Sequence, residues 1–174
     1  MVSKSLIWKF LLVVAAGGAA LDRSQSTFHS GERQPASEIL SAEVIRIVDG
    51  DTIHIQGADK QPIKIRLAGI DCPERDQPWG DTATRALSRL VTGQVVDIAV
   101  VDIDRYGRTV GRVFLRDQNI NRVMVKAGNC WAYTRYVRDS KLLELEKEAQ
   151  LANRGLWSQP KANQIPPWEW RRHK

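Results

Sequence analysis

Alternating apolar and polar residues predict three strands in the first half of the chain. In the stretches 42–48, 51–56 and 61–70, isoleucine, valine or leucine recurs at every second position. Turn-forming residues separate these runs, at Asp49-Gly50 and again at 57–60. We therefore expect three antiparallel strands joined as a meander.

The second half of the chain mixes helical and strand patterns. Apolar residues recur at helical spacing in 81–93, 119–128 and 139–155, and each segment ends at a glycine. The apolar runs 94–103 and 109–115, separated by a turn, are predicted strands. Five short, twisted strands tend to close on themselves, so the pattern predicts an α+β fold with a small, barrel-like sheet and three helices.

Both ends of the chain differ from this domain, which we place at residues 38–158. Residues 1–20 carry lysines, then an apolar run, then small residues, the pattern of a signal peptide cleaved after Ala20. The run is too short for a comfortable membrane span of about 20 residues, and an uncleaved N-terminal anchor is the alternative. Residues 21–37 read as a flexible linker, and 159–174 as a tail rich in Pro, Trp and Arg.

Composition limits the classes of protein and partner. Hydrophobic residues make up 43% of the chain, which excludes a disordered protein. A net charge of +6 favours anionic partners such as nucleic acid. The three histidines and two cysteines lack zinc-site spacing. Export would permit one disulfide, between Cys72 and Cys130, but the sequence leaves that pairing open.

Three carboxylates flank the second and third predicted strands. Asp51 opens the second strand, while Asp71 and Glu74 follow the third. In a simple meander we expect these positions at opposite ends of neighbouring strands, so the carboxylates meet only if the sheet coils strongly or the turn folds back. Carboxylate oxygens alone suit Ca²⁺ or Mg²⁺ and not zinc. Ordinary turn chemistry is the alternative.

Two arginines lie near these carboxylates in the predicted fold. Arg66 lies within the third strand, on the face opposite Ile65 and Leu67, and Arg108 ends the turn "DRYGR". A guanidinium binds phosphate oxygens through two hydrogen bonds and stays charged, so two such groups could stabilise a phosphoryl group in transfer. A salt-bridged or solvated arginine is the alternative for each.

Four motifs together resemble the thermonuclease family, whose prototype is staphylococcal nuclease. They are "VDGDT", "IRLAGIDCPE", "DRYGRTVGRV" and "NRGLW", in this order, within residues 42–157. The resemblance implies an OB-type five-stranded β-barrel with three helices. It also implies metal-assisted hydrolysis of phosphodiester bonds in DNA or RNA with little sequence preference.

The resemblance assigns a metal site and a general base. Asp51 and Asp71 resemble calcium-ligating carboxylates, with the backbone carbonyl of Cys72 as a further ligand. Glu74 resembles the glutamate that orients or deprotonates the attacking water. The prototype has threonine at the position of Cys72, and a disulfide to Cys130 would constrain the metal loop.

The resemblance also assigns the substrate contacts. Arg66 and Arg108 resemble the pair that binds the scissile phosphate. Tyr133 aligns with the first of two tyrosines that line the family's nucleotide pocket, and Tyr136 matches the second after a shift of register. Tyr106 is expected to face the substrate, with a packed turn tyrosine as the alternative.

These inferences together predict an exported, periplasmic or secreted, Ca²⁺-dependent nuclease. DNA or RNA is the expected partner, no stable membrane association is expected after signal cleavage, and the oligomeric state is left open with a monomer as the expectation. One alternative is a non-catalytic OB-fold module that binds nucleic acid. Another is an interaction protein whose "PPWEWRRHK" tail docks a partner, although Trp168 and Trp170 could equally pack back on the domain.

Overall fold

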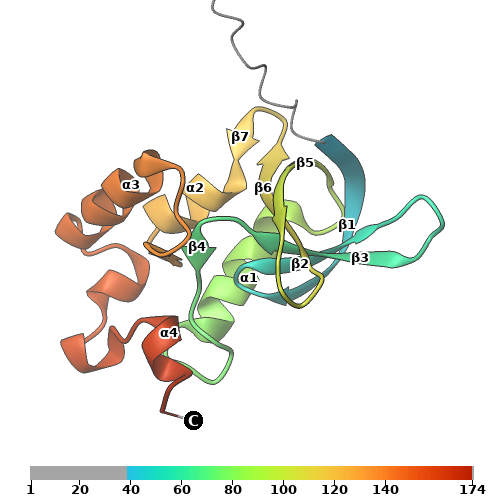
Figure 1. The fold of residues 1–174 in the computed structure, drawn as a ribbon. Coiled ribbons are helices and arrows are strands. Elements are labelled where there is room, and N and C mark those ends of the chain that lie inside the picture. The colour runs from blue at the N-terminus through green and yellow to red at the C-terminus, as the bar shows by residue number, and fades with distance from the viewer. Residues whose placement is uncertain (1–38, 174) are drawn as a thin grey trace, which may run out of the picture. The chain divides into compact units, whose positions relative to one another are not determined.

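The structure, a computed structural model, describes residues 39–173. The predicted signal peptide and linker (1–37) lie outside the described residues. Five strands form a closed β-barrel (Figure 1), and they are β1 (Ile39–Asp49), β2 (Thr52–Gln56), β3 (Pro62–Leu67), β5 (Val95–Ile103) and β6 (Thr109–Leu115). The predicted OB-type α+β fold is therefore confirmed.

The order of the strands explains how the barrel closes. β1, β2 and β3 pair antiparallel as the predicted meander, and β5 joins the other side of β1. β6 pairs antiparallel with β5 and parallel with β3, so the sheet order β3-β2-β1-β5-β6 returns to its start. Such closure leaves no long free edge among these strands.

Three two-residue strands were not predicted. β7 (Gln118–Asn119) pairs antiparallel with the end of β6, while β4 (Ile70–Asp71) pairs with β8 (Trp131–Ala132) in a separate small sheet. Two residues cannot show a periodic pattern, so these strands depend on tertiary contacts that the sequence does not reveal. The β4–β8 pair matters because it brings the segment after β3 against the segment after the second helix.

The three predicted helices are present with slightly different bounds. They are α1 (Gly80–Val91), α2 (Ile120–Lys126) and α3 (Ser140–Leu151). The side chain of Asn119 caps α2 by accepting a hydrogen bond from the Arg122 backbone N–H. α1 begins one residue before the predicted segment 81–93 and follows Trp79, whose backbone is left-handed (φ 74°).

The tail also has regular structure. It contains two 3₁₀ turns, η1 (Gly155–Ser158) and η2 (Lys161–Asn163), and a short helix, α4 (Pro167–Trp170). Figure 1 shows α4 beside the loop that leads from β4 to α1, and a hydrogen bond joins the two segments. The tail therefore packs back on the domain. Within residues 39–173, no helix is long and apolar enough to cross a membrane.

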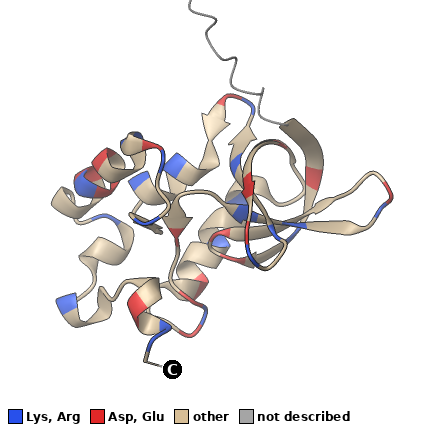
Figure 2. Ribbon diagram, in the orientation of Figure 1, with Lys and Arg blue, Asp and Glu red and all other residues tan. Residues whose placement is uncertain are grey.

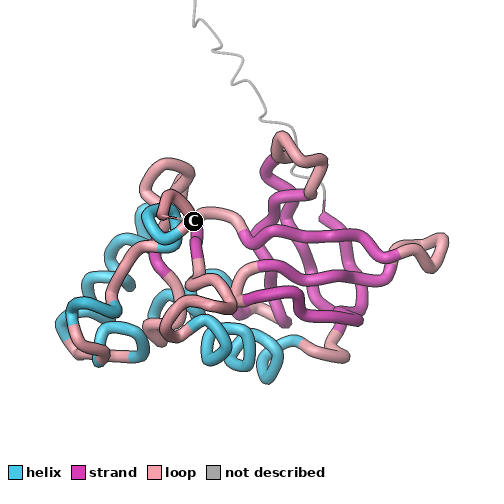
Figure 3. The backbone as a smooth tube through the Cα atoms, turned by 90° about the horizontal axis from the view of Figure 1, so that it is seen from below, coloured by secondary structure: helices cyan, strands magenta, loops and turns pink. Residues whose placement is uncertain are grey.

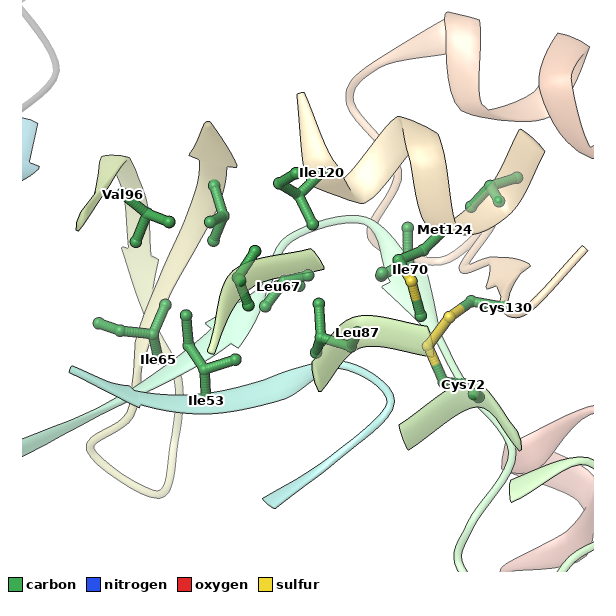
Figure 4. Packing of buried hydrophobic residues seen from close by; sticks show 14 of the residues in the cluster. Ile53, Ile65, Leu67, Ile70, Cys72, Leu87, Val96, Ile120, Met124 and Cys130 are labelled. Atoms are coloured by element: carbon green, nitrogen blue, oxygen red, sulfur yellow. A yellow bond between two sulfur atoms is a disulfide. The ribbon is translucent and has the colours of Figure 1, made fainter. Parts of the chain in front are cut away.

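One hydrophobic core joins the barrel to the helices. Side chains from the strands, including Ile53, Ile65 and Ile98, are fully buried inside the barrel together with Leu87 of α1. The core continues toward α2 and α3 through Met124 and the two cysteines (Figure 4). Figure 3 shows the helices gathered to one side of and below the strands.

Candidate active site

The β2–β3 hairpin brings the predicted site residues to one end of the barrel. Thr52 pairs with Arg66, and the Leu67 backbone N–H donates to the Asp51 carbonyl at 2.8 Å. The expectation that the start of the second strand and the end of the third lie apart is wrong. Antiparallel neighbours run in opposite directions, so the start of one adjoins the end of the other.

Arg66 connects two of the carboxylates directly. Its Nη1 lies 3.1 Å from Asp51 Oδ1, and its Nη2 lies 3.0 Å from Asp71 Oδ1. The Asp71 side chain is only 2% exposed and that of Asp51 8%, so these ion pairs are shielded from water. Because the guanidinium is rigid, it fixes the two carboxylates relative to each other.

Asp51 ties the turn before β2 to the loop after β4. Its Oδ2 accepts a hydrogen bond from the Cys72 backbone N–H at 2.7 Å, and its Oδ1 accepts one from the Thr52 hydroxyl at 3.2 Å. Burial raises the pKa of Asp51 well above its usual value, while the charge of Arg66 opposes that shift. A bound cation would favour the ionised form in the same way.

Gly50 lets the two segments approach this closely. A Cβ added there would lie 2.7 Å from the Cys72 Cβ and 3.0 Å from the Ala83 Cβ, so no larger residue fits without movement. The sequence "VDGDT" thus has a steric reason for its glycine as well as a chemical reason for its second aspartate.

A disulfide fixes the loop that carries Asp71 and Cys72. Cys72 is bonded to Cys130, with the two Cα atoms 4.1 Å apart, and both side chains are buried. Next to it, Asp71 pairs with Trp131 in the β4–β8 ladder. The Cys72 backbone is therefore held by a covalent bond, a β ladder and the hydrogen bond to Asp51.

Glu74 lies at the edge of the site and is more accessible. Its side chain is 33% exposed, and its backbone N–H donates to Gln77 Oε1 at 3.1 Å. The loop turns so tightly that a Cβ on Gly80 would overlap the Glu74 carbonyl. Glu74 also borders an open hollow of about 420 Å³, with Arg46, Val48, Asp49, Arg75 and Asp76. Water and substrate can reach a carboxylate in this position.

Arg171 is the site residue that sequence reasoning missed. Its Nη2 lies 2.7 Å from Asp71 Oδ2, and its Nη1 lies 2.6 Å from Glu74 Oε1. Desolvation opposes the charge, but hydrogen bonds to Asp71 and Glu74 raise the pKa of Arg171. Figure 2 shows basic and acidic segments close together where the C-terminal segment meets the loop after β4. Arg171 follows Asp71 by 100 residues, so no local pattern could have revealed the pair.

Arg108 is placed differently from Arg66. Its Nε donates to Asp104 Oδ2 at 2.7 Å, within the turn between β5 and β6. Arg108 lies just before β6, two residues from Val110, which is the partner of Arg66 in the β3–β6 ladder, and its ion pair is with Asp104 and not with the site carboxylates. Tyr106 is 68% exposed in the same turn, and the Arg108 guanidinium lies 5.6 Å from its ring centroid.

Tyr133 and Tyr136 lie together in the loop after β8. Their ring centroids are 4.9 Å apart at an interplanar angle of 66°, and Tyr136 is 58% exposed. The Tyr133 backbone N–H donates to the Gly69 carbonyl, which fixes it beside β4. Trp168 of α4 stacks on Tyr133 with centroids 5.2 Å apart and planes 6° from parallel. The tail therefore contacts the predicted nucleotide-binding tyrosine as well as the carboxylates.

The donor set fits a hard divalent cation in chemistry. Asp51, Asp71 and Glu74 offer only carboxylate oxygens, and with Arg66 and Arg171 their formal charge is −3 + 2 = −1. In the arrangement described for residues 39–173, no three His, Cys, Asp or Glu side chains surround a common metal position. The two guanidinium groups hold these carboxylates instead.

Comparisons with known proteins agree with the fold and the motifs. The family described as staphylococcal nuclease homologue matches residues 64–159, more than half of the chain. Protein ParB of Escherichia coli is 43% identical over 149 residues, covering 79% of this chain and 82% of the relative. A micrococcal nuclease of Shigella flexneri is 42% identical over 149 residues, covering 79% and 84%.

A third relative aligns over a longer region. An uncharacterized endonuclease of Haemophilus influenzae is 34% identical over 174 residues, covering 100% of this chain and 89% of its own length. These similarities extend well beyond the short motifs and cover the barrel and the helices together. The chain therefore belongs to the staphylococcal nuclease family and is a nuclease.

Proposed function

We propose that this nuclease is exported and Ca²⁺-dependent, and that it hydrolyses phosphodiester bonds of DNA or RNA with little sequence preference. The observation that carries the proposal is the shared guanidinium of Arg66, which lies within 3.1 Å of both Asp51 and Asp71. Glu74 follows three residues after Asp71 and is exposed enough to meet water. Two buried carboxylates, one accessible carboxylate and a fixed arginine are suited to phosphoryl chemistry.

Calcium is the proposed metal because the available ligands are all oxygens, which suit Ca²⁺ or Mg²⁺, and because Asp51 and Asp71 resemble calcium-ligating carboxylates. Asp51, Asp71 and the Cys72 backbone carbonyl would hold the ion, which would neutralise phosphate charge when bound. The nuclease family is generally metal-dependent. Firm positioning of the Cys72 backbone by its disulfide and its hydrogen bond to Asp51 supports a role for that carbonyl.

Each side chain has a distinct role in the proposed hydrolysis. Glu74 accepts the proton of the attacking water, which can reach this carboxylate because its side chain is 33% exposed. Arg66 and Arg108 bind the nonbridging phosphate oxygens and stabilise the charge that develops on them. For Arg108 to do so, its guanidinium must leave the ion pair with Asp104 and bind the phosphate.

Limited sequence preference follows from the types of contact available. Tyr133, Tyr136 and Tyr106 offer aromatic faces, on which any base can stack. Arginines bind phosphates, which are the same at every nucleotide. The proposed contacts therefore place the substrate without reading base edges.

Export is supported by the chain's first twenty residues and by the disulfide. A lysine-containing start, an apolar run and small residues form a signal-peptide pattern in 1–20. The Cys72–Cys130 bond persists in oxidising compartments and is rare in the cytosol. A periplasmic or secreted location satisfies both observations.

The proposal is tested by digesting single-stranded DNA, double-stranded DNA and RNA side by side. We expect cleavage of nucleic acid in Ca²⁺, loss of cleavage with a chelator, and recovery when Ca²⁺ is restored. Cleavage that continues in chelator would reject the metal assignment. Binding of all three nucleic acids without cleavage under any metal would instead support a non-catalytic OB-fold module.

A further inference from the structure

The segment 165–171, here called the docked tail, lies on the proposed active site. The buried side chain of Gln77 donates from Nε2 to the Ile165 carbonyl at 2.5 Å, and its Oε1 accepts from the Glu74 backbone. Pro167, the first residue of α4, is buried. The docked tail is thus attached to the same loop that carries Glu74.

Arg171 uses the carboxylate oxygens that a metal would use. Arg66 contacts Asp71 Oδ1 at 3.0 Å, and Arg171 contacts Asp71 Oδ2 at 2.7 Å, so both oxygens of Asp71 are engaged. Arg171 also binds Glu74 at 2.6 Å. A divalent cation that takes Asp71 Oδ2 as a ligand competes with Arg171, because both positive charges favour the same position against that oxygen and repel each other there.

Trp168 uses the aromatic surface that a base would use. Its ring is almost parallel to that of Tyr133, with 5.2 Å between centroids. Trp131 meets Trp168 edge-on at 5.8 Å, which holds the indole in this orientation. A nucleobase that stacks on the same face of Tyr133 must displace Trp168.

We propose that the docked tail is an intramolecular competitor, in which Arg171 excludes the divalent cation and Trp168 excludes a nucleobase. This inference rests on the proposed function of the site. It differs from a substrate-binding role for the tail, because the tail residues use the contacts of both ligands and do not add new ones. Cation and nucleic acid then release the tail together, so each favours binding of the other.

The docking contacts are weak enough to be reversible. Arg171 is 42% exposed, so water screens its charge even though its partner Asp71 is buried. The Trp170 indole nitrogen is buried without a hydrogen-bond partner among the described residues, which opposes docking. α4 has only four residues and little stability of its own. The docked state can therefore compete with ligands without blocking the enzyme permanently.

Calorimetric titration with CaCl₂ alone tests the competition without measuring activity. Arg171→Gln removes the charge that binds Asp71 and Glu74, and Arg172→Gln is its matched control, a neighbouring exposed arginine. Any affinity tag belongs at the N-terminal side, so that the tail is native. If the tail is docked about 90% of the time, Arg171→Gln lowers the calcium Kd about tenfold, since only the undocked fraction binds. Arg172→Gln should match the wild type.

The outcomes separate this inference from the proposed function. Equal calcium Kd values for the wild type and Arg171→Gln, with normal digestion of DNA, would overturn only the competition. Weaker calcium binding by Arg171→Gln would also overturn it, by showing that Arg171 supports the metal site. Absence of calcium binding by all three proteins would overturn the calcium assignment itself.

A second variant tests whether Trp168 excludes a nucleobase. Trp168→Ala should bind a fluorescent oligothymidylate in chelator several-fold more tightly than the wild type, measured by anisotropy, because the face of Tyr133 is freed. Trp168→Phe should behave nearly like the wild type. Weaker binding by Trp168→Ala would overturn the competition and make Trp168 part of the substrate surface.

Discussion

Two parts of the chain meet at Asp71, and they are built in opposite ways. On one side, Arg66 comes from a barrel strand, is 14% exposed, and holds carboxylates that turns, a ladder and a disulfide also position. On the other side, Arg171 comes from a short tail helix and is 42% exposed. We call the first part, around Arg66, the barrel side and the second part, around Arg171, the tail side. We infer that the barrel side is preorganised for chemistry and that the tail side dissociates when ligands bind.

Loss of Arg66 is the largest expected effect and tests the barrel side. Arg66→Ala leaves the buried Asp51 without its paired cation and Asp71 with Arg171 alone, so we expect the free energy of unfolding to fall by about 3 kcal/mol. Digestion should fall about 10³-fold. Urea denaturation and initial rates measure the two effects. Arg66→Lys keeps the charge but loses the planar guanidinium, so its digestion rate should lie between those of the wild type and Arg66→Ala. Near-wild-type rates for both variants would show that the barrel side is not the site.

The disulfide is the next test of preorganisation. It closes a loop of 58 residues, so replacing both Cys72 and Cys130 by serine should lower the free energy of unfolding by about 4 kcal/mol. Calcium affinity should fall as well, because the Cys72 backbone is less firmly held. Denaturation and calcium calorimetry provide the measurements. Unchanged calcium affinity in a destabilised variant would separate the disulfide from the metal site.

Arg108 tests whether a partly exposed arginine in the turn between β5 and β6 can still act in chemistry. Its ion pair with Asp104 lies near the surface, so Arg108→Gln should change stability by less than about 1 kcal/mol. The kcat should nevertheless fall about 10²-fold if the guanidinium binds the transferring phosphate. Arg89→Gln, an exposed arginine on α1, is the control. Equal kcat values for the two variants would remove Arg108 from the site.

Gln77 connects the two sides, and its substitution should have the smallest effect on activity. Gln77→Ala removes hydrogen bonds to the Glu74 backbone and to Ile165, at a cost of about 1–3 kcal/mol. The tail should undock more often, so calcium should bind a few-fold more tightly, while kcat falls a few-fold because Glu74 is less fixed. An unchanged calcium Kd would show that Gln77 does not hold the tail in place.

The sequence predicted the barrel side much better than the tail side. Alternation located the strands, and placed Arg66 opposite Ile65 and Leu67, which are buried as expected. That Asp51 and Asp71 lie close together could be predicted only with the register of the β2–β3 hairpin. The expectation from strand order, that the start of the second strand and the end of the third lie apart, was wrong. Motifs within one hairpin are local, so their spacing carries structural information.

The remaining contacts could not be predicted because they join distant segments. Arg171 and Trp168 stood out only as part of a basic, aromatic tail, and their contacts depend on where η1, η2 and α4 direct the chain. The sequence left the pairing of Cys72 with Cys130 undecided for the same reason, since the distance between the two cysteines depends on the β4–β8 pairing.

Glu74 gives the most direct test of the central claim that this end of the barrel hydrolyses phosphodiester bonds. The measurement is the rate of cleavage of single-stranded DNA at saturating Ca²⁺ by Glu74→Gln, with Glu43→Gln, an exposed glutamate on β1, as the control. We predict a loss of about 10²–10⁴-fold for Glu74→Gln, with the circular dichroism spectrum retained, and a wild-type rate for Glu43→Gln. A wild-type rate for a folded Glu74→Gln would contradict the account.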